Sequence, residues 1–153
     1  MKYKYLFLSL MLLILACSVV AISADEDYGS IGDYTLDIPD GYEIVNKTDN
    51  MLSMQVDTDH AIVMSLPDAI KDSDDFKAQL EKQGYEFGDE DTYTVGNFNI
   101  NQYNYNKDTY QGFLYICDDG KDSPILITLV MPADEDAPSP DDNPVTQIIN
   151  SLE

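Results

Sequence analysis

The chain contains no arginine and no tryptophan, and it has a single histidine, His60. Without arginine it lacks the side chain best suited to clamp phosphate or carboxylate groups through paired hydrogen bonds. His60 follows a predicted turn and has no second histidine or cysteine at the spacing of a transition-metal site, so we interpret it as a solvated turn residue. Glycine-rich phosphate loops and the GxSxG turn of serine hydrolases do not occur. The sequence therefore predicts a protein that is not an enzyme, with no catalytic residues and no cofactor.

Positive charge is also scarce, because eight lysines face 29 aspartates and glutamates. Two of these lysines lie before residue 25, so residues 25–153 carry six lysines and a formal charge of −23. Such a surface repels the phosphates of nucleic acids and the headgroups of anionic lipids. We expect no nucleic-acid partner. Cations, basic proteins and neutral glycans remain, and a protein or glycan at the cell surface is the expected partner.

Only one long stretch lacks charge altogether, and it covers residues 5–23. Lys2 and Lys4 precede it, small residues end it, and acidic residues begin at Asp25. This arrangement predicts that residues 1–24 are a signal peptide or an N-terminal membrane anchor. The signal could be cleaved after residue 23 or 24, retained as a membrane-spanning segment, or lipidated at Cys17. All three alternatives place the remaining chain outside the cytoplasmic membrane, secreted or on the cell surface, with membrane contact only through residues 5–23 if uncleaved.

Cysteine is nearly absent from the rest of the chain, where Cys117 stands alone. No disulfide within residues 25–153 can form, so the domain must depend on its hydrophobic core. Cys117 lies in a strand-like run and is expected to be a small buried hydrophobe. We expect residues 25–32 to be a polar lead-in and residues 33–153 to form a single domain.

Alternating apolar residues predict strands in much of this domain. The first lies over residues 34–38, and residues 52–56 and 62–66 form a hairpin. Further strands follow the acidic residues 89–91, with a β-bulge expected at residues 101–102, where the alternation slips by one position. The run ILITLVM, residues 125–131, is apolar on both faces and predicts a central strand covered from both sides.

Two helices complete the pattern. Asp72 or Ser73 is placed to cap the first, Phe76 and Leu80 share one face, and Gly84 supplies a left-handed stop. The second begins at Pro144 after a cap at Asp142 or Asn143. Its apolar stripe consists of Val145, Ile148, Ile149 and Leu152. The sequence therefore predicts an α+β fold with a mainly antiparallel central sheet and two flanking helices.

Several segments resemble the PsbP-like superfamily of exported proteins. They are YTLDIPDGYEI, MLSMQVDTDHAIVMSL, DDFKAQL, VGNFNINQYNY, GFLYI, SPILITLVM and VTQIINSLE. The resemblance implies a PsbP-like sandwich and an accessory or binding role without catalytic residues. The chain also resembles small surface proteins of methanogenic archaea in its size, its acidity and its bias towards Asn, Ile and Lys. The function we expect is a non-enzymatic extracytoplasmic accessory or binding domain, and the alternative is a membrane-anchored structural envelope protein.

Three candidate sites stand out. Asn46 begins an N-glycosylation sequon, expected in an exposed segment between strands. Tyr103 and Tyr105 alternate with asparagines and either form a partner-binding face or pack against neighbouring strands. A weaker candidate is an irregular calcium site, built from Asp118, Asp119 and Asp122 or from the loop of residues 134–142.

Overall fold

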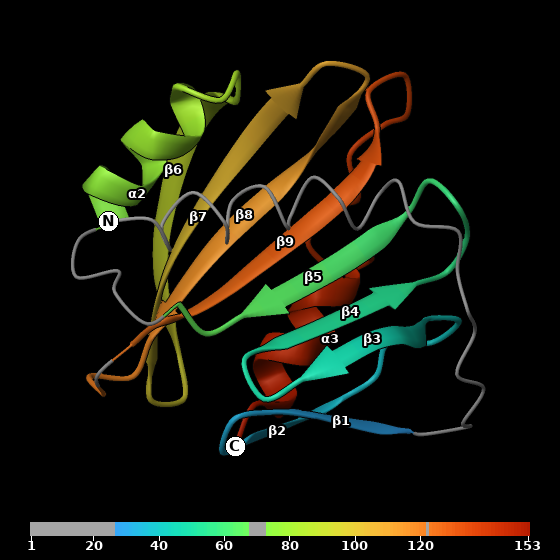
Figure 1. Ribbon diagram of the computed structural model, residues 1–153, viewed down its shortest axis with the longest axis vertical. Coiled ribbons are helices and arrows are strands. Elements are labelled where there is room, and N and C mark those ends of the chain that lie inside the picture. The colour runs from blue at the N-terminus through green and yellow to red at the C-terminus, as the bar shows by residue number, and fades with distance from the viewer. Residues whose placement is uncertain (1–26, 68–72, 122) are drawn as a thin grey trace.

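A computed structural model describes residues 27–67, 73–121 and 123–153 (Figure 1). These residues form an α+β fold with a seven-stranded antiparallel sheet, a separate two-stranded sheet and two helices. The predictions of a signal, an anchor and a lipidated cysteine within residues 1–24 lie outside the described residues, as does the cap at Asp72. Among the described residues, no helix is both long and apolar enough to cross a membrane.

The large sheet is antiparallel at every pairing, with strand order β3-β4-β5-β9-β8-β7-β6. Its strands, in chain order, are β3 (Glu43–Thr48), β4 (Met51–Gln55), β5 (Ala61–Ser65), β6 (Glu86–Val95), β7 (Phe98–Lys107), β8 (Tyr110–Asp118) and β9 (Ile125–Pro132). β9 occupies the middle and is buried along its whole length except at Pro132. The predicted central strand is therefore confirmed. It joins a meander of β3, β4 and β5 to a second meander of β6, β7 and β8.

Strands β1 (Tyr28–Ile31) and β2 (Tyr34–Asp37) pair as a short hairpin beside this sheet. Gly32 turns between them with φ +55°, a backbone conformation that glycine adopts without a steric penalty. The prediction that residues 25–32 are only a polar lead-in is wrong, because β1 belongs to the fold and Ile31 is buried in the core. A strand of four residues, half of them small or polar, has too little alternation to be recognised.

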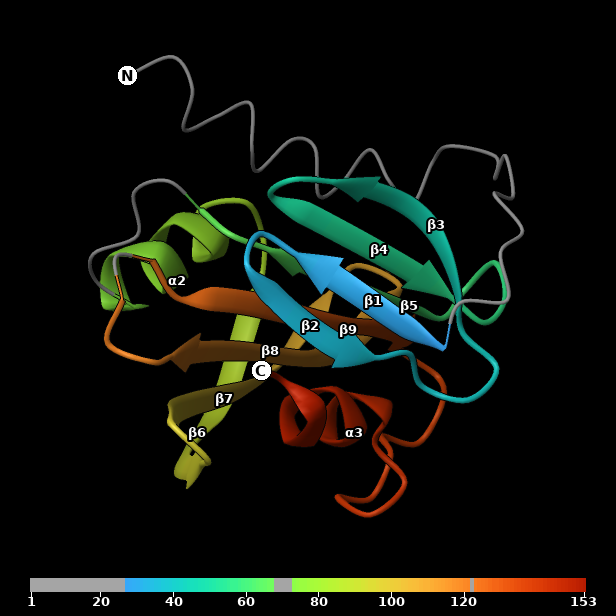
Figure 2. The ribbon, with the colours of Figure 1, turned by 90° about the horizontal axis from the view of Figure 1, so that it is seen from below.

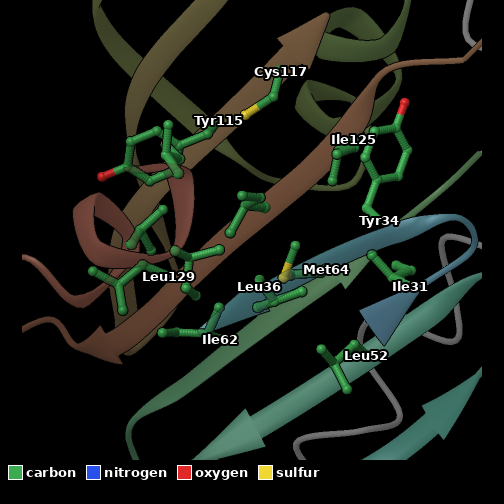
Figure 3. Packing of buried hydrophobic residues seen from close by; sticks show 14 of the residues in the cluster. Ile31, Tyr34, Leu36, Leu52, Ile62, Met64, Tyr115, Cys117, Ile125 and Leu129 are labelled. Carbon is green, nitrogen blue, oxygen red and sulfur yellow. The ribbon is translucent and has the colours of Figure 1, made fainter. Parts of the chain in front are cut away.

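Helix α3 (Pro144–Ser151) forms where the sequence predicts it, with Asn143 as its N-cap and Pro144 in the first turn. It ends one residue before Leu152, which was predicted to belong to its apolar stripe and is instead the C-cap. Val145, Ile148 and Ile149 are buried against one face of the large sheet, and the β1–β2 hairpin covers the same face beside the helix (Figures 2 and 3). Figure 3 shows side chains of β4, β5, β8 and β9 meeting those of β1 and β2 in this main core.

Helix α2 (Ser73–Glu81) covers the opposite face over β6 and β7 (Figure 1). Phe76 and Leu80 point into a second hydrophobic cluster that includes Tyr103 and Tyr105 of β7. Gly84 ends the helix at φ +89°, and the Tyr85 amide donates to the Leu80 carbonyl, as in a Schellman motif. The predicted left-handed stop is confirmed.

Burial on both faces explains the irregular pattern of β7. Phe98 and Ile100 point into the main core, whereas Tyr103 and Tyr105 point into the cluster beneath α2. The bulge predicted at residues 101–102 is wrong, because β7 pairs with β8 in unbroken register. The register shift lies instead in the neighbouring strand β6, between residues 87 and 90.

Strands were expected only after the acidic residues 89–91, but these residues lie within the edge strand β6, which is exposed along most of its length. β3, at the other edge, was also missed. An edge strand with solvent on both faces needs no apolar alternation, and charged side chains there discourage pairing with another chain.

Candidate functional site

An open groove of about 590 Å³ runs along α3. It is lined by α3 itself, the end of β2, the β2–β3 loop and the loop before α3. Four aspartates line it: Asp37 and Asp40 on one wall, Asp141 and Asp142 on the other. None of the lining residues is basic. The α3 side chains Thr146, Gln147 and Asn150 add amide and hydroxyl groups to its floor.

The wall of the groove formed by the loop before α3 is held by Asn143, the N-cap of this helix. The Asn143 Oδ1 accepts a hydrogen bond of 3.0 Å from the Val145 amide, and its Nδ2 lies 2.6 Å from the Tyr115 hydroxyl oxygen, to which it donates. Because Asn143 is only 7% exposed, both contacts are made away from water. Asp141 and Asp142 directly precede this anchor, which therefore sets where their side chains enter the groove.

The opposite wall is tied to the end of the same helix. The Asp37 amide donates to the Ser151 hydroxyl at 2.8 Å, and that hydroxyl donates to the Ile148 carbonyl at 2.9 Å. Thr35 and Glu153 exchange two backbone hydrogen bonds, of 3.1 and 3.2 Å. β2 and α3 therefore hold both walls at a fixed separation.

Four carboxylates around one open groove produce a negative potential that attracts cations and basic groups. The neighbouring amides and hydroxyls supply both donors and acceptors, which can fix the orientation of a bound polar group. A surface of this kind can bind basic, polar ligands.

A smaller pocket of about 220 Å³ lies at the other end of α3. There the Tyr34 hydroxyl donates to Asp119 at 2.9 Å, and the Lys121 ammonium lies 3.0 Å from the same carboxylate and over the Tyr34 ring. Burial raises the pKa of Asp119, but the hydrogen bonds from Lys121 and Tyr34 outweigh it and hold the pKa below its usual value. Asp119 therefore remains charged and already has its cation.

Several carboxylates of the loops considered for calcium already have partners within the protein. Among the described residues, no group of three or more His, Cys, Asp or Glu side chains is placed to hold a metal ion. Asp118 accepts a hydrogen bond from the Gly120 amide, Asp119 pairs with Lys121, and Asp122 lies outside the described residues. In the loop of residues 134–142, Glu135 and Asp142 contact His60 and Ser139, respectively.

His60, which was interpreted as a solvated turn residue, joins two loops through its imidazole ring. Its Nδ1 lies 2.9 Å from Asp57 within the β4–β5 turn, and its Nε2 lies 2.8 Å from Glu135 in the β9–α3 loop. Partial burial lowers the pKa of His60, but hydrogen bonds to the two carboxylates outweigh it and raise the pKa above its ordinary value. The sequence offered no signal for this bridge, because Glu135 lies 75 residues away.

The predicted partner-binding face of Tyr103 and Tyr105 is wrong. Their side chains are 1% and 4% exposed and lie beneath α2. The Tyr103 hydroxyl donates to Glu90 at 2.8 Å, and the Tyr105 hydroxyl donates to the Leu129 carbonyl at 2.9 Å. The alternative, packing against neighbouring aromatic side chains, is what the structure has, since both rings contact Phe87.

Two other sequence expectations concern single residues. Asn46 lies within the edge strand β3, where it is half-buried opposite Ser53, and not between strands as expected. Cys117 is fully buried as expected, and burial raises the pKa of its thiol to about 12. A thiol held neutral in this way is a poor nucleophile.

The groove itself was not predicted. Asp141 and Asp142 belong to the loop considered for calcium, but nothing in the sequence connects them to Asp37 and Asp40, about a hundred positions earlier. In comparisons with known proteins, no protein-family model matches the chain, and no curated protein matches it.

Proposed function

We propose that this chain is a non-enzymatic accessory or binding domain that acts outside the cytoplasmic membrane, and that its fold is a PsbP-like sandwich. The basic head and uncharged run of residues 1–24 support an extracytoplasmic location. The order of elements supports the PsbP-like assignment, with α2 and α3 on opposite faces of an antiparallel sheet.

The groove along α3 carries the proposal that binding is its role. Four aspartates and no basic residue line a rigid, open surface of about 590 Å³. A basic segment of a protein partner at the cell surface fits this chemistry, because lysine and arginine side chains would meet four carboxylates on two walls that are tied to α3. Pre-organised walls reduce the entropy that binding has to overcome.

A direct test uses a hexalysine peptide as the probe and the double variant Asp40→Asn, Asp141→Asn. We expect the variant to bind the peptide at least about tenfold more weakly, because two of the four carboxylates that line the groove lose their charge. The matched control is Asp89→Asn, Asp91→Asn, which removes the same charge from the exposed strand β6. Calorimetry at low and moderate salt measures the affinity of each double variant for the peptide.

Equal loss in the two double variants would contradict the proposal, because it would mean that the peptide responds only to the overall charge of the domain. A loss confined to the groove variant, persisting at moderate salt, would support a defined binding site.

A further inference from the structure

The face of the large sheet that carries α2 is only partly covered by the described elements. α2 packs over the end formed by β6, β7 and β8, and α3 lies on the opposite face (Figure 1). The remaining part, over β4, β5 and β9, is the patch formed by Met51, Ser53, Val63, Ser65, Thr128 and Val130, whose alignment across the three strands follows from the pairing register. Neither hydrophobic cluster includes any of these six residues.

The β4–β5–β9 patch is nevertheless shielded from water, since none of its residues is more than 6% exposed. Within residues 27–67, 73–121 and 123–153, neither helix packs over it. A sheet face of small and apolar side chains requires a covering layer in a folded domain.

The apolar members of the patch, Met51, Val63 and Val130, indicate the chemistry of that layer, because apolar side chains are stabilised by apolar neighbours. Ser53, Ser65 and Thr128 are buried, and their hydroxyl oxygens have no hydrogen-bond partner among the described residues. Two serines near the centre also leave room for the layer to approach the strands closely.

We propose that the uncharged run of residues 5–23 packs on the β4–β5–β9 patch whenever it is retained in the chain. This run is the only long uncharged segment outside the described residues. Residues 24–26 are all that separate it from the start of the described chain. The strand that follows, β1, contacts β3 and β4 on the opposite face, so the run would reach the patch by passing around the β3 edge of the sheet.

Length and charge both favour this occupant. Even at about 1.5 Å per residue the run extends for about 28 Å, whereas three neighbouring strands are only about 10 Å across. A second copy of the domain is the less favourable occupant, because two molecules with a formal charge of −21 each would have to approach one another. Packing on the patch also competes with insertion into a membrane, because one segment cannot do both.

The test uses native Cys17, which lies within the run, and the full chain purified without detergent. Ser53→Cys and Ser65→Cys each place a thiol in the patch, and Gln147→Cys places one on the exposed side of α3 as the matched control. Cys117 is fully buried and stays out of the reaction. After mild oxidation, peptide mass mapping should find an intramolecular link from Cys17 to one or both patch positions, and none above background in the control.

A second measurement does not depend on which residue of the run lies next to which residue of the patch. Leu13→Glu introduces a charge into the run, and it should raise the fluorescence of a hydrophobic dye several-fold by uncovering the patch, whereas Lys2→Glu should not. A patch link, or a dye response specific to Leu13→Glu, supports the proposal. Links no more abundant than in the control, together with unchanged dye binding, would overturn it. Links between molecules only would assign the patch to a second copy.

Discussion

Asn143 shows how much one side chain can organise in this protein. Its side-chain oxygen Oδ1 caps α3, and its side-chain nitrogen Nδ2 donates a hydrogen bond to the hydroxyl of Tyr115. Tyr115 is only 1% exposed in the main core. A capping contact contributes about 1 kcal/mol, and a buried hydroxyl left without a partner costs about 1–3 kcal/mol. The same residue therefore stabilises the helix, completes the core and positions one wall of the groove.

The His60 bridge makes stability depend on pH in a definite direction. A group whose pKa is raised by folding stabilises the fold fully below its unfolded value, about 6.5, and loses that contribution as the pH rises through the folded value. We expect His60→Gln to be less stable than the unmodified chain by up to about 1 kcal/mol below pH 6.5, since both carboxylate partners are largely exposed. The difference should shrink towards pH 9.

Thermal unfolding between pH 5 and pH 9 measures this effect. Glu135→Gln is the matched control, because it removes one carboxylate but keeps the imidazole, and it should show the same trend with a smaller amplitude. A difference that grew with pH would mean that neutral His60, and not the imidazolium, is the form that joins the two loops.

At the scale of elements, the tightest contact joins β8 to β9. A Cβ atom added to Gly112 of β8 would lie 1.8 Å from the Leu129 carbonyl oxygen, an impossible distance without backbone movement. The same carbonyl accepts the hydrogen bond from Tyr105. Glycine is needed here because the backbone of β8 and the Tyr105 side chain of β7 both approach this oxygen atom of β9.

We therefore expect Gly112→Ala to lower the free energy of unfolding by at least about 2 kcal/mol through strain between these strands. Gly96→Ala is a suitable control, because nothing lies within 4 Å of the added atom at that β6–β7 turn and only its left-handed backbone, φ +56°, opposes the change. Urea unfolding followed by circular dichroism compares the two. Equal losses would mean that backbone conformation, and not crowding, determines the effect at Gly112.

The elements that sequence patterns predicted well are those whose signals are local. The cap and stripe of α3, the stop at Gly84 and the apolar run of β9 all depend on residues close together in the chain. β3 and the first half of β6 were missed because edge strands face solvent and lose the alternation that marks a strand. β1 was missed because it has only four residues, two of them small or polar.

The candidate site was less predictable for a different reason. Tyr103 and Tyr105 resemble an exposed aromatic face in the sequence, and only the position of α2 shows that they are buried. The groove requires β2 and the loop before α3 to meet, a contact between distant segments that no local motif encodes.

For the whole molecule, charge is the dominant property. Residues 25–153 carry six lysines against 29 acidic residues, and four described ion pairs offset only a few of these charges. Mutual repulsion between carboxylates is stronger in the compact state than in the unfolded chain. Salt should therefore stabilise the domain, because it shortens the range of that repulsion from about 30 Å at 0.01 M to about 3 Å at 1 M.

We expect the melting temperature to rise by several degrees between 0.01 M and 1 M sodium chloride, and to rise equally in magnesium or calcium chloride at matched ionic strength. The variant Asp89→Asn, Asp91→Asn should show a weaker dependence on salt, since it removes two neighbouring charges from β6. A saturable rise found only with calcium would contradict simple screening and would indicate a defined calcium site.

The central position of β9 has a consequence for how the chain reaches its final form. All other described strands precede β9 in the chain, yet β9 lies between β5 and β8 and connects the two halves of the sheet. Until residues 125–132 are in place, the inner edges of both meanders have free backbone amides and carbonyls, which invite pairing with other chains. If the chain is exported as proposed, it would hold two unjoined half-sheets until residues 125–132 have emerged, and a chaperone would protect it most at that stage.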